Sequence, residues 1–443
     1  MQRLLYSELL KWKKSAEHKP LILQGVRQCG KTWLLKEFGD NEFEDTAYFN
    51  FERTTQLVSY FEGDFEPKRI IDTLGLSRNK AIVPGKTLLI LDEIQICPRA
   101  ITSLKYFAEE LPELHIAAAG SLLGVSLAQM GKQISFPVGK VRTLTLYPLN
   151  FEEYLLANGY DMLRDKLAAS DENDDAASLF EQKLTELYYQ YLITGGMPAA
   201  VNTWISSHNI EEVDTILSSI LSDYEKDFVK YAPKNDYPKL TAVWESIPEQ
   251  LAKENQKFIF SRVKTGARAR DLEDALYWLI SAGLIYKVSK AEQPFIPLSA
   301  AADTTNFKIY LSDTGLLRVL SGFEPGVILN MNDQTAYMRG ILTENFILTE
   351  LISTGHKQLY FWKAKSAAEV DFLLQNNSMV IPVEVKAGKN IRSRSLTEYS
   401  KKYAPKTAVR CSLQPLSVHN DESGTLLSVP NYLVWNLQKY LRT

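Results

Sequence analysis

Short apolar runs alternate with helix-like stretches along the first third of the chain. The runs lie at 20–24, 47–51, 87–91 and 114–119. Stretches such as 31–38 and 101–110, which have the pattern of helices, separate them. Because strands that alternate with helices imply βαβ crossovers, we expect an α/β domain over residues 1–150, with a parallel sheet and helices on both faces.

The pattern changes beyond residue 150. Residues 151–235 have the pattern of a helical region. Residues 236–325 contain a helix with its apolar positions on one face, followed by Gly283 and the strand LIYKV, which together suggest a winged helix. Residues 326–443 add an apolar-periodic helix and three short strands, which indicate a small α/β domain. With residues 1–150, these regions make four expected domains.

The octapeptide GVRQCGKT, residues 25–32, matches the phosphate-binding pattern GxxxxGK[ST]. It follows an apolar strand and opens a helix, which is the context that the pattern requires. Its glycines let backbone N–H groups point inward at phosphate oxygens, and the helix N-terminus adds partial positive charge. Lys31 would reach the β- and γ-phosphates of ATP, and Thr32 would bind Mg²⁺. The expected nucleotide-binding residues are Gly25, Val26, Arg27, Gln28, Cys29, Gly30, Lys31, Thr32 and Trp33.

The strand TLLILDE, residues 87–93, ends in two carboxylates. Asp92 can hold Mg²⁺ together with Thr32, and Glu93 can orient and deprotonate the attacking water. An apolar strand can also end in acidic residues by chance, but here it follows a complete phosphate-binding loop. The pair therefore favours hydrolysis over nucleotide binding alone, with Lys31 and Glu93 as the catalytic residues.

A third apolar strand, LHIAAAG, ends just before Ser121. A polar residue at this place in a parallel sheet can contact the γ-phosphate or the attacking water. The alternative is that Ser121 caps a following helix, because Leu122 and Leu123 come next. Both roles stay open.

The motifs GVRQCGKT, LLILDE, IAAAGS and VRTLTLYPLNFEEYL resemble those of the AAA+-type ATPases of a widespread prokaryotic group with a trailing domain of uncharacterised function. LITGGMPAAV, KIYLSDTGLL and RGILTENFILTEL extend the resemblance over nearly the whole chain. It implies an ATPase core, a helical lid at 151–235, a winged-helix-like segment at 236–325 and a restriction-endonuclease-like domain at 326–443.

One departure from this group concerns the arginine that senses the γ-phosphate. The group usually has Gly-Arg where this chain has Gly139-Lys140, so Arg142 becomes the candidate sensor. Sites of this type often take an arginine from a neighbouring subunit. The resemblance therefore allows an oligomer and leaves the identity of that arginine open.

Two apolar strands, EVDFLL and VIPVEVK, flank the turn QNNSM in the last domain. A symmetric hairpin about Asn377 and Ser378 places Asp371 opposite Glu384, and Lys386 then shares a face of the sheet with Glu384. Paired carboxylates suit Mg²⁺ or Mn²⁺, and a nearby lysine can stabilise charge on a scissile phosphate. This arrangement predicts a metal-dependent nuclease of restriction-endonuclease type.

Glu344, on the preceding helix, is a further candidate ligand of that metal ion. The same register offers a different account, because it also places Glu369 opposite Lys386, where the two side chains can form a cross-strand ion pair. Whether this domain cleaves nucleic acid, binds it without cleavage or is inert stays open.

The overall charge is nearly balanced, with 50 Lys and Arg against 53 Asp and Glu, which excludes a uniformly basic protein that coats nucleic acid. Residues 259–270 nevertheless carry four basic and no acidic side chains, and residues 381–410 carry eight basic and two acidic ones. Both segments can contact phosphates of DNA or RNA, although the first can also be a solvated loop. Without a membrane-length apolar run or the apolar core of a signal peptide, we expect a cytoplasmic protein and no membrane partner.

These observations together predict an ATP-binding protein that hydrolyses ATP with Mg²⁺ and thereby drives a conformational change of its nuclease-like C-terminal domain. Two alternatives differ in what that domain does. It is either part of a nucleotide-gated module that binds nucleic acid or protein without cleavage, or an active nuclease with a second Mg²⁺ or Mn²⁺.

Overall fold

The computed structural model describes residues 1–121, 124–125, 136–171, 176–233, 235–252, 256–329, 333–365, 368–389, 394–422 and 424–441. By its internal contacts the chain forms two compact units. The first contains Met1–Pro148 and Ser281–Leu284, and the second contains Leu149–Ile280 and Ile285–Thr443. The expected division into four domains is finer than this and stays a prediction.

The first unit contains a five-stranded parallel sheet in the order β2-β3-β4-β1-β5. Its strands are β1 (Leu21–Gln24), β2 (Asp45–Asn50), β3 (Thr87–Asp92), β4 (His115–Gly120) and β5 (Arg142–Thr145). β3 and β4 are buried along their whole length, as is usual for parallel strands covered on both faces. Because the strands are parallel, the residues that follow β1, β3 and β4 meet at one edge of the sheet.

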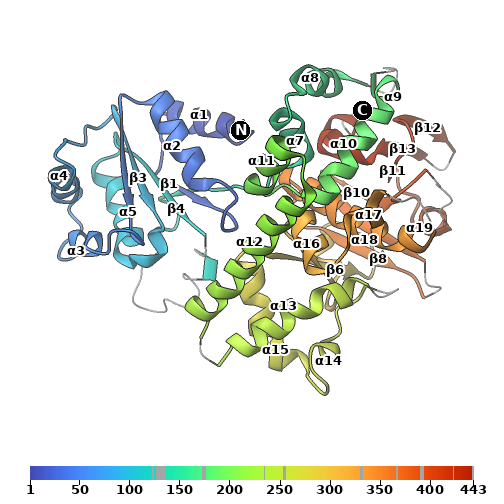
Figure 1. Ribbon diagram of the computed structural model, residues 1–443. Helices are drawn as coiled ribbons and strands as arrows, with labels where there is room; N and C mark the ends of the chain where they lie inside the picture. The colour runs from blue at the N-terminus through green and yellow to red at the C-terminus, as the bar shows by residue number, and fades with distance from the viewer. Residues whose placement is uncertain are drawn as a thin grey trace. The chain divides into compact units, whose positions relative to one another are not determined.

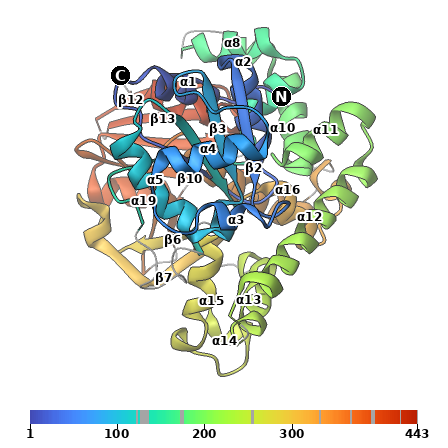
Figure 2. The ribbon, with the colours of Figure 1, turned by 90° about the vertical axis from the view of Figure 1, so that its left-hand side faces the viewer.

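Helices cover both faces of this sheet (Figure 1). They are α1 (Tyr6–Lys14), α2 (Lys31–Glu42), α3 (Leu57–Tyr60), α4 (Pro67–Ser77) and α5 (Pro98–Glu110), with a short 3₁₀ helix η1 (Ile94–Ile96). α4 and α5 both begin with proline, whose fixed φ suits the first helical position. α3, α4 and α5 lie on one face of the sheet (Figure 2), where their apolar side chains join its core. α2 packs against β2, β3 and β4.

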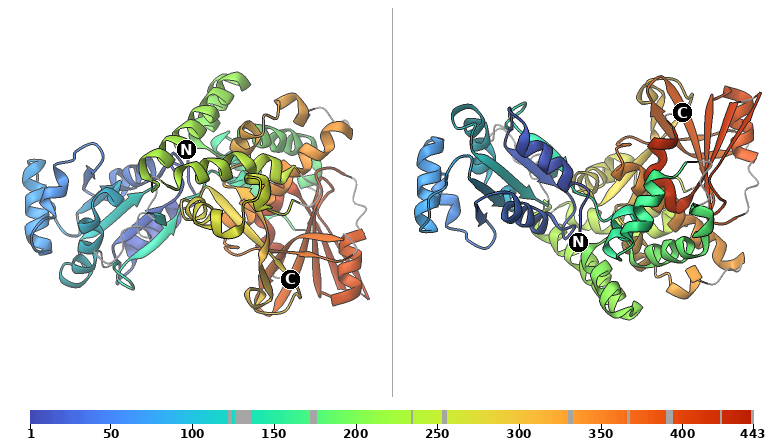
Figure 3. Two further views of the ribbon diagram at one scale, coloured as in Figure 1. Left: turned by 90° about the horizontal axis from the view of Figure 1, so that it is seen from below. Right: turned by 90° about the horizontal axis from the view of Figure 1, so that it is seen from above.

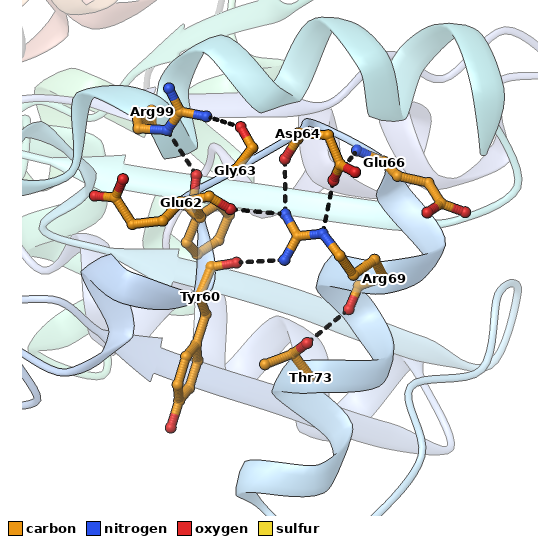
Figure 4. A network of polar contacts seen from close by, with 9 residues as sticks. Tyr60, Glu62, Gly63, Asp64, Glu66, Arg69, Thr73 and Arg99 are labelled. Atoms are coloured by element: carbon orange, nitrogen blue, oxygen red, sulfur yellow. Dashed lines mark hydrogen bonds and ion pairs between the residues drawn. The ribbon is translucent and has the colours of Figure 1, made fainter.

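Two arginines hold the segment 60–66, which connects α3 to α4 (Figure 4). Arg69 donates to three carbonyl oxygens of this segment, and its Nε lies 2.7 Å from Oδ1 of Asp64. Arg99, in the first turn of α5, donates to two more. Because one segment is bonded to both helices, α4 and α5 are fixed against each other close to where β3 ends.

The second unit contains a mixed eight-stranded sheet in the order β12-β13-β11-β10-β9-β8-β6-β7 (Figure 3). The strands are β6 (Ile285–Ala291), β7 (Ala302–Leu311), β8 (Tyr360–Lys363), β9 (Glu369–Asn376), β10 (Met379–Val385), β11 (Thr407–Ser412), β12 (Ser417–Asp421) and β13 (Gly424–Pro430). β6 pairs in parallel with β8. One sheet therefore runs across the expected boundary at residue 325.

Helices of the second unit come before, between and after these strands. They are α7 (Phe151–Ala157), α8 (Asp161–Ala169), α9 (Ala176–Leu179), α10 (Glu181–Thr194), α11 (Pro198–Ser207), α12 (Ile210–Tyr231), α13 (Tyr237–Leu251), α14 (Phe260–Val263), α15 (Ala269–Ser281), α16 (Thr314–Leu320), α17 (Pro325–Leu329), α18 (Asp333–Ser353), α19 (Arg394–Tyr403) and α20 (Leu437–Tyr440), with the 3₁₀ helices η3 (Leu298–Ala301) and η4 (Asn431–Asn436). On α18, the ring of Phe346 packs edge-on against Tyr188, Tyr191 and Phe151. This cluster joins α18 to α7 and α10.

The α/β fold class is confirmed, with helices on both faces of a parallel sheet in the first unit and a second, mixed sheet in the other. The strand LIYKV, expected as the wing of a winged helix, lies at the start of β6 and pairs with both β7 and β8. Among the described residues, no helix is long and apolar enough to cross a membrane.

Candidate nucleotide site and a buried charge cluster

The segment 25–30 forms a tight loop between β1 and α2. Gly25 and Gly30 have φ angles of 152° and 98°, which residues other than glycine rarely adopt. A Cβ atom at Gly25 would also lie 2.1 Å from the carbonyl oxygen of Leu146. Only glycine fits at this position. The loop therefore has the conformation that turns backbone N–H groups toward a bound phosphate.

Lys31 begins α2, and its side chain folds back over the loop. The residue is 5% exposed, and Nζ donates to the carbonyl oxygens of Gly25 and Val26, each at 2.8 Å. These acceptors are neutral peptide oxygens, which hold an ammonium group less strongly than a phosphate does. Trp33, by contrast, is 44% exposed on the first turn of α2.

Thr32 and Asp92 are joined directly, since Oγ1 of Thr32 lies 2.9 Å from Oδ2 of Asp92. Tyr48 and Asn50, on β2, donate to the same carboxylate oxygen at 2.8 and 3.2 Å. Burial and the bond to Asp92 raise the pKa of Tyr48 to about 12, so it remains a donor at neutral pH. We did not anticipate these two residues from the sequence. The feature that could have revealed them is the register of β2 and β3, which pairs Asn50 with Asp92.

Glu93 follows β3 in the left-handed conformation, with φ 53°, and its backbone N–H donates to Oδ1 of Asp92. The amide of Gln95 donates to its carboxylate at 2.5 Å. Burial raises the pKa of Glu93 above its ordinary value, and the charge of Asp92 adds to this effect. A carboxylate with a raised pKa is a better proton acceptor near neutral pH.

The two sensor candidates are placed differently. Ser121 is buried directly after β4, and the leucines that decide whether it caps a helix lie outside the described residues. Arg142 begins β5 and forms an ion pair with Glu8 of α1 at 3.0 Å. Lys140, which stands where the group usually has arginine, pairs with Glu109 at 3.0 Å.

Arg3 is a contact of the phosphate-binding loop that the sequence did not reveal. It is 5% exposed, and its guanidinium donates to the carbonyl oxygens of Cys29, at 2.7 Å, and of Tyr147. The thiol of Cys29 lies 3.4 Å from the carbonyl oxygen of Leu146. The loop is therefore fixed from outside to the segment that follows β5.

In the second unit, the hairpin of β9 and β10 has the expected register, with Met379 opposite Asn376 and Val383 opposite Phe372. Asp371 and Glu384 follow as the next pair. One oxygen of Asp371 accepts from the backbone N–H of Val385 at 2.7 Å. The other members of the predicted metal site, however, have different partners from those expected.

Lys386 pairs with Glu384 at 3.0 Å and not with Glu369. Glu369 instead accepts from two lysines, Lys308 at 2.5 Å and Lys363 at 2.6 Å. The predicted Glu369–Lys386 ion pair is therefore wrong, because Lys308, which lies far away in the sequence, is brought to Glu369 by the fold.

Lys308, on β7, is 1% exposed and also donates to Glu344 at 3.0 Å. The hydroxyl of Tyr310 donates to the same glutamate oxygen. We call Lys308, Tyr310, Glu344, Glu369 and Asp371 the Lys308 cluster. Within the described part of the chain, no group of three or more His, Cys, Asp or Glu side chains is arranged to hold a metal ion.

Burial and mutual charge shift the pKa values of this cluster. Burial alone would lower the pKa of Lys308, but the attraction of the surrounding carboxylates raises it above its ordinary value. Burial, followed by the charge of Glu344, raises the pKa of Asp371 well above its ordinary range. Burial would raise the pKa of Glu369 as well, but its lysine partners hold it below the ordinary value. Lys308 is therefore permanently charged.

The basic segments differ in how much of their charge is already paired. Arg262, Lys264, Arg268 and Arg270 of the first segment are all exposed. In the second segment, Lys386 and Lys389 pair with Glu384 and Glu181, and residues 390–393 lie outside the described residues. Arg394, Lys401, Lys402 and Lys406 of the second segment are exposed as well. Both segments therefore present basic side chains to solvent.

Comparisons with known families divide the chain in three. Residues 17–155 match the AAA domain, residues 185–326 match a Domain of unknown function (DUF8612), and residues 339–432 match another Domain of unknown function (DUF4143). A search of curated proteins gave no match. The match to the AAA domain supports ATP binding and hydrolysis, whereas the C-terminal match does not identify a restriction-endonuclease-like domain.

Three similar solved structures share little sequence identity with this chain. The Walker-type ATPase PABY2304 of Pyrococcus abyssi is 14% identical, with 72% of this chain and 95% of that chain covered and a TM-score of 0.43. DnaA of Aquifex aeolicus bound to AMPPCP is 12% identical, with 63% and 88% covered and a TM-score of 0.29. The ORC1 protein of Aeropyrum pernix in complex with DNA is 14% identical, with 74% and 92% covered and a TM-score of 0.26.

Proposed function

We propose that the first unit binds ATP with Mg²⁺ and hydrolyses it. The observation that carries this proposal is the hydrogen bond between Thr32 and Asp92, because it joins the end of the phosphate-binding loop to the acidic end of β3. The match of residues 17–155 to the AAA domain supports it. In this proposal Thr32 and Asp92 hold Mg²⁺, Lys31 binds the β- and γ-phosphates, and Glu93 activates the attacking water.

The residues present fit ATP and Mg²⁺. The loop from Gly25 to Gly30 has the backbone conformation of a phosphate cradle, and Lys31 is held by neutral oxygens that a polyphosphate can replace. Asp92 accepts hydrogen bonds from uncharged donors, so its negative charge stays available for a cation. Magnesium, when bound, would neutralise charge on the phosphates, while Glu93 takes the proton from water.

A cavity of about 680 Å³ lies next to this loop, between α1 and α2. Its lining includes Arg3, Tyr6, Trp33, Glu37 and Asn41. Aromatic and polar side chains together suit a nucleotide base, which stacks on one and bonds to the other. We therefore assign this cavity to the base, with Trp33 at its wall.

Phosphate release by the purified full chain tests the proposal. Replacing Lys31 by alanine should lower the rate by about 10²–10³-fold, because it removes a positive charge directed at the reacting phosphate. Lys86→Ala is the matched control, since Lys86 is an exposed lysine paired with Glu44. Hydrolysis at the wild-type rate in Lys31→Ala would refute the assigned site.

We also propose that hydrolysis changes the conformation of the second unit. The segment 146–149 supports this, since hydrogen bonds hold both of its ends. The carbonyl oxygen of Leu146 accepts from the thiol of Cys29, and Leu149 bonds through its backbone N–H to Gly196 and through its carbonyl oxygen to Tyr191. A change in the phosphate-binding loop therefore reaches α7 and α10 through a few residues. Amide exchange of α7 and α10 should differ between the ADP-bound and ATP-bound forms of Glu93→Gln, and identical exchange would contradict the coupling.

A second candidate function, binding of DNA or RNA, rests on the exposure of the four basic side chains at 262–270. They lie on α14, on α15 and in the loop between them, within the segment expected to be a winged helix. Binding of a labelled duplex should weaken steeply with salt and weaken further in Arg268→Ala/Arg270→Ala. Binding that does not change with salt would exclude phosphate contacts.

A further inference from the structure

A lysine contacts Glu344, one of the carboxylates that the sequence assigns to a second metal ion, and Asp371, another of them, is near enough to interact with its charge. Nζ of Lys308 donates to Glu344 at 3.0 Å, to Glu369 at 2.5 Å and to the amide oxygen of Gln256 at 2.9 Å. Lys308 and Glu344 come from β7 and α18, and Glu369 from the hairpin strand β9. Two elements, α18 and β9, and the segment between α13 and α14 thus direct polar side chains at one buried ammonium group on β7.

Three of the four carboxyl groups in this region are balanced by lysines without a metal ion. Lys308 and Lys363 balance Glu344 and Glu369, and Lys386 balances Glu384, which leaves Asp371 outside these ion pairs. A divalent cation placed among them would add two positive charges beside a lysine that is 1% exposed. Like charges at such a distance in a buried environment repel strongly, so ion and lysine would compete for the same carboxylates.

One oxygen of each of the three carboxyl groups already has a hydrogen-bond partner, although Oε2 of Glu384 is buried without one. The oxygen of Glu344 that accepts from Lys308 also accepts from Tyr310, and Oδ2 of Asp371 accepts from Val385. Oε1 of Glu384 is bonded to Lys386. Mg²⁺ requires near-octahedral oxygen ligands at about 2.0–2.1 Å, which means that several of these bonds would have to break.

We propose that the ammonium group of Lys308 is the resident cation of the Lys308 cluster and takes the position that a metal ion would hold in a nuclease. The second Mg²⁺ or Mn²⁺ expected from the sequence does not fit this arrangement. Lys386, neutralised by Glu384, is likewise not available for a scissile phosphate. The C-terminal domain therefore does not use this cluster for metal-dependent cleavage.

Binding of Mn²⁺ to the nucleotide-free full chain, followed by electron paramagnetic resonance, tests this proposal. Wild type and Asp371→Asn should bind Mn²⁺ equally, because the cluster contributes no site. Lys308→Ala should bind one additional Mn²⁺ per chain, since carboxylates are left without their cation. The double variant Lys308→Ala/Glu344→Gln should lose that ion again.

The first comparison uses no lysine variant, so it decides the question even if Lys308→Ala does not fold. Wild-type binding of Mn²⁺ that disappears in Asp371→Asn would overturn the proposal. So would a folded Lys308→Ala, verified by its cooperative thermal unfolding, that gains no ion. Lys308→Gln serves as the milder replacement. Cleavage of plasmid DNA with Mg²⁺ or Mn²⁺ that is lost in Asp371→Asn would also refute it.

Discussion

Lys31 and Lys308 are both buried lysines close to carboxylates, but they differ in their partners. Lys31 donates to the peptide oxygens of Gly25 and Val26, which are neutral. Lys308 forms ion pairs with two glutamates. A polyphosphate can draw Lys31 away from peptide oxygens at small cost, whereas drawing Lys308 away would leave the buried Glu344 without a charged partner, at a cost of several kcal/mol. The first lysine is therefore available to a ligand and the second is not.

The acidic side of each group shows the same difference. Asp92 accepts from hydroxyl and amide groups, none of which carries charge. Glu344 and Glu369 accept from ammonium groups. The same residue types thus differ in the charge of their partners: at the proposed Mg²⁺ site the partners are uncharged, and in the Lys308 cluster they are ammonium groups.

Replacing Glu93 by glutamine should have the largest effect on ATP hydrolysis and tests the role assigned to Glu93 in the nucleotide site. Loss of the general base should lower phosphate release by about 10²–10⁴-fold while ATP still binds. Because the pKa of Glu93 is raised, the wild-type rate should fall as pH drops through that raised pKa, where the carboxylate takes up a proton. Rates measured against pH should show this fall in the wild type and a flat residual rate in the variant.

Lys308→Met tests the Lys308 cluster and should leave hydrolysis unchanged. Breaking a buried ion pair from one side costs about 3–5 kcal/mol, because Glu344 remains buried without a charged partner, while Glu369 still pairs with Lys363. Urea unfolding of the second unit should show this loss. Lys363→Met is the control, since Lys363 is 24% exposed and its loss leaves Glu369 paired with Lys308. Equal effects of the two substitutions would contradict a special role for Lys308.

The contrast also shows what the sequence could and could not predict. The apolar runs of the first 150 residues correctly indicated a parallel sheet, and GVRQCGKT placed Lys31 and Thr32 because a short local segment determines that loop. The symmetric turn about Asn377 gave the register of β9 and β10.

Residues from distant strands were not predictable in this way. Tyr48, Asn50 and Arg3 reach the nucleotide site from other elements, and Lys308 reaches the hairpin through the pairing of β6 with β8. That pairing joins strands with more than fifty residues between them, and the local apolar pattern does not specify which strands become neighbours. The metal-site prediction failed to include Lys308 for this reason.

Glu350→Gln addresses a third arrangement, a buried carboxyl group without a lysine. One oxygen of Glu350 accepts from the backbone N–H of Phe151, and burial raises the pKa of this carboxyl group from its ordinary 4.5 to about 8. Between these values the folded chain keeps a proton that the unfolded chain has released. The free energy of unfolding therefore falls as pH rises from 4.5 to 8.

The glutamine side chain does not take up this proton. The free energy of unfolding of the variant, relative to that of the wild type, should therefore increase by up to about 1.4 kcal/mol for each unit by which pH rises within that window. Urea unfolding at several pH values measures the difference, with Glu186→Gln, an exposed glutamate, as the control. A difference between variant and wild type that stays constant with pH would show that Glu350 is ionised in the folded chain.

Arg142→Ala should have the smallest effect. Arg142 and Glu8 form an ion pair in which both side chains are 36% exposed, and such pairs contribute about 0–1 kcal/mol. Because the guanidinium is directed at α1, we expect the rate of phosphate release to change less than about twofold. Removing a group that stabilises the reacting phosphate would instead lower the rate by about 10²-fold or more. Glu8→Gln, which removes only the partner, is the matched control. A large fall in rate for Arg142→Ala but not for Glu8→Gln would show that Arg142 leaves Glu8 when ATP binds and acts as the γ-phosphate sensor, which would place a second exchangeable cation beside Lys31.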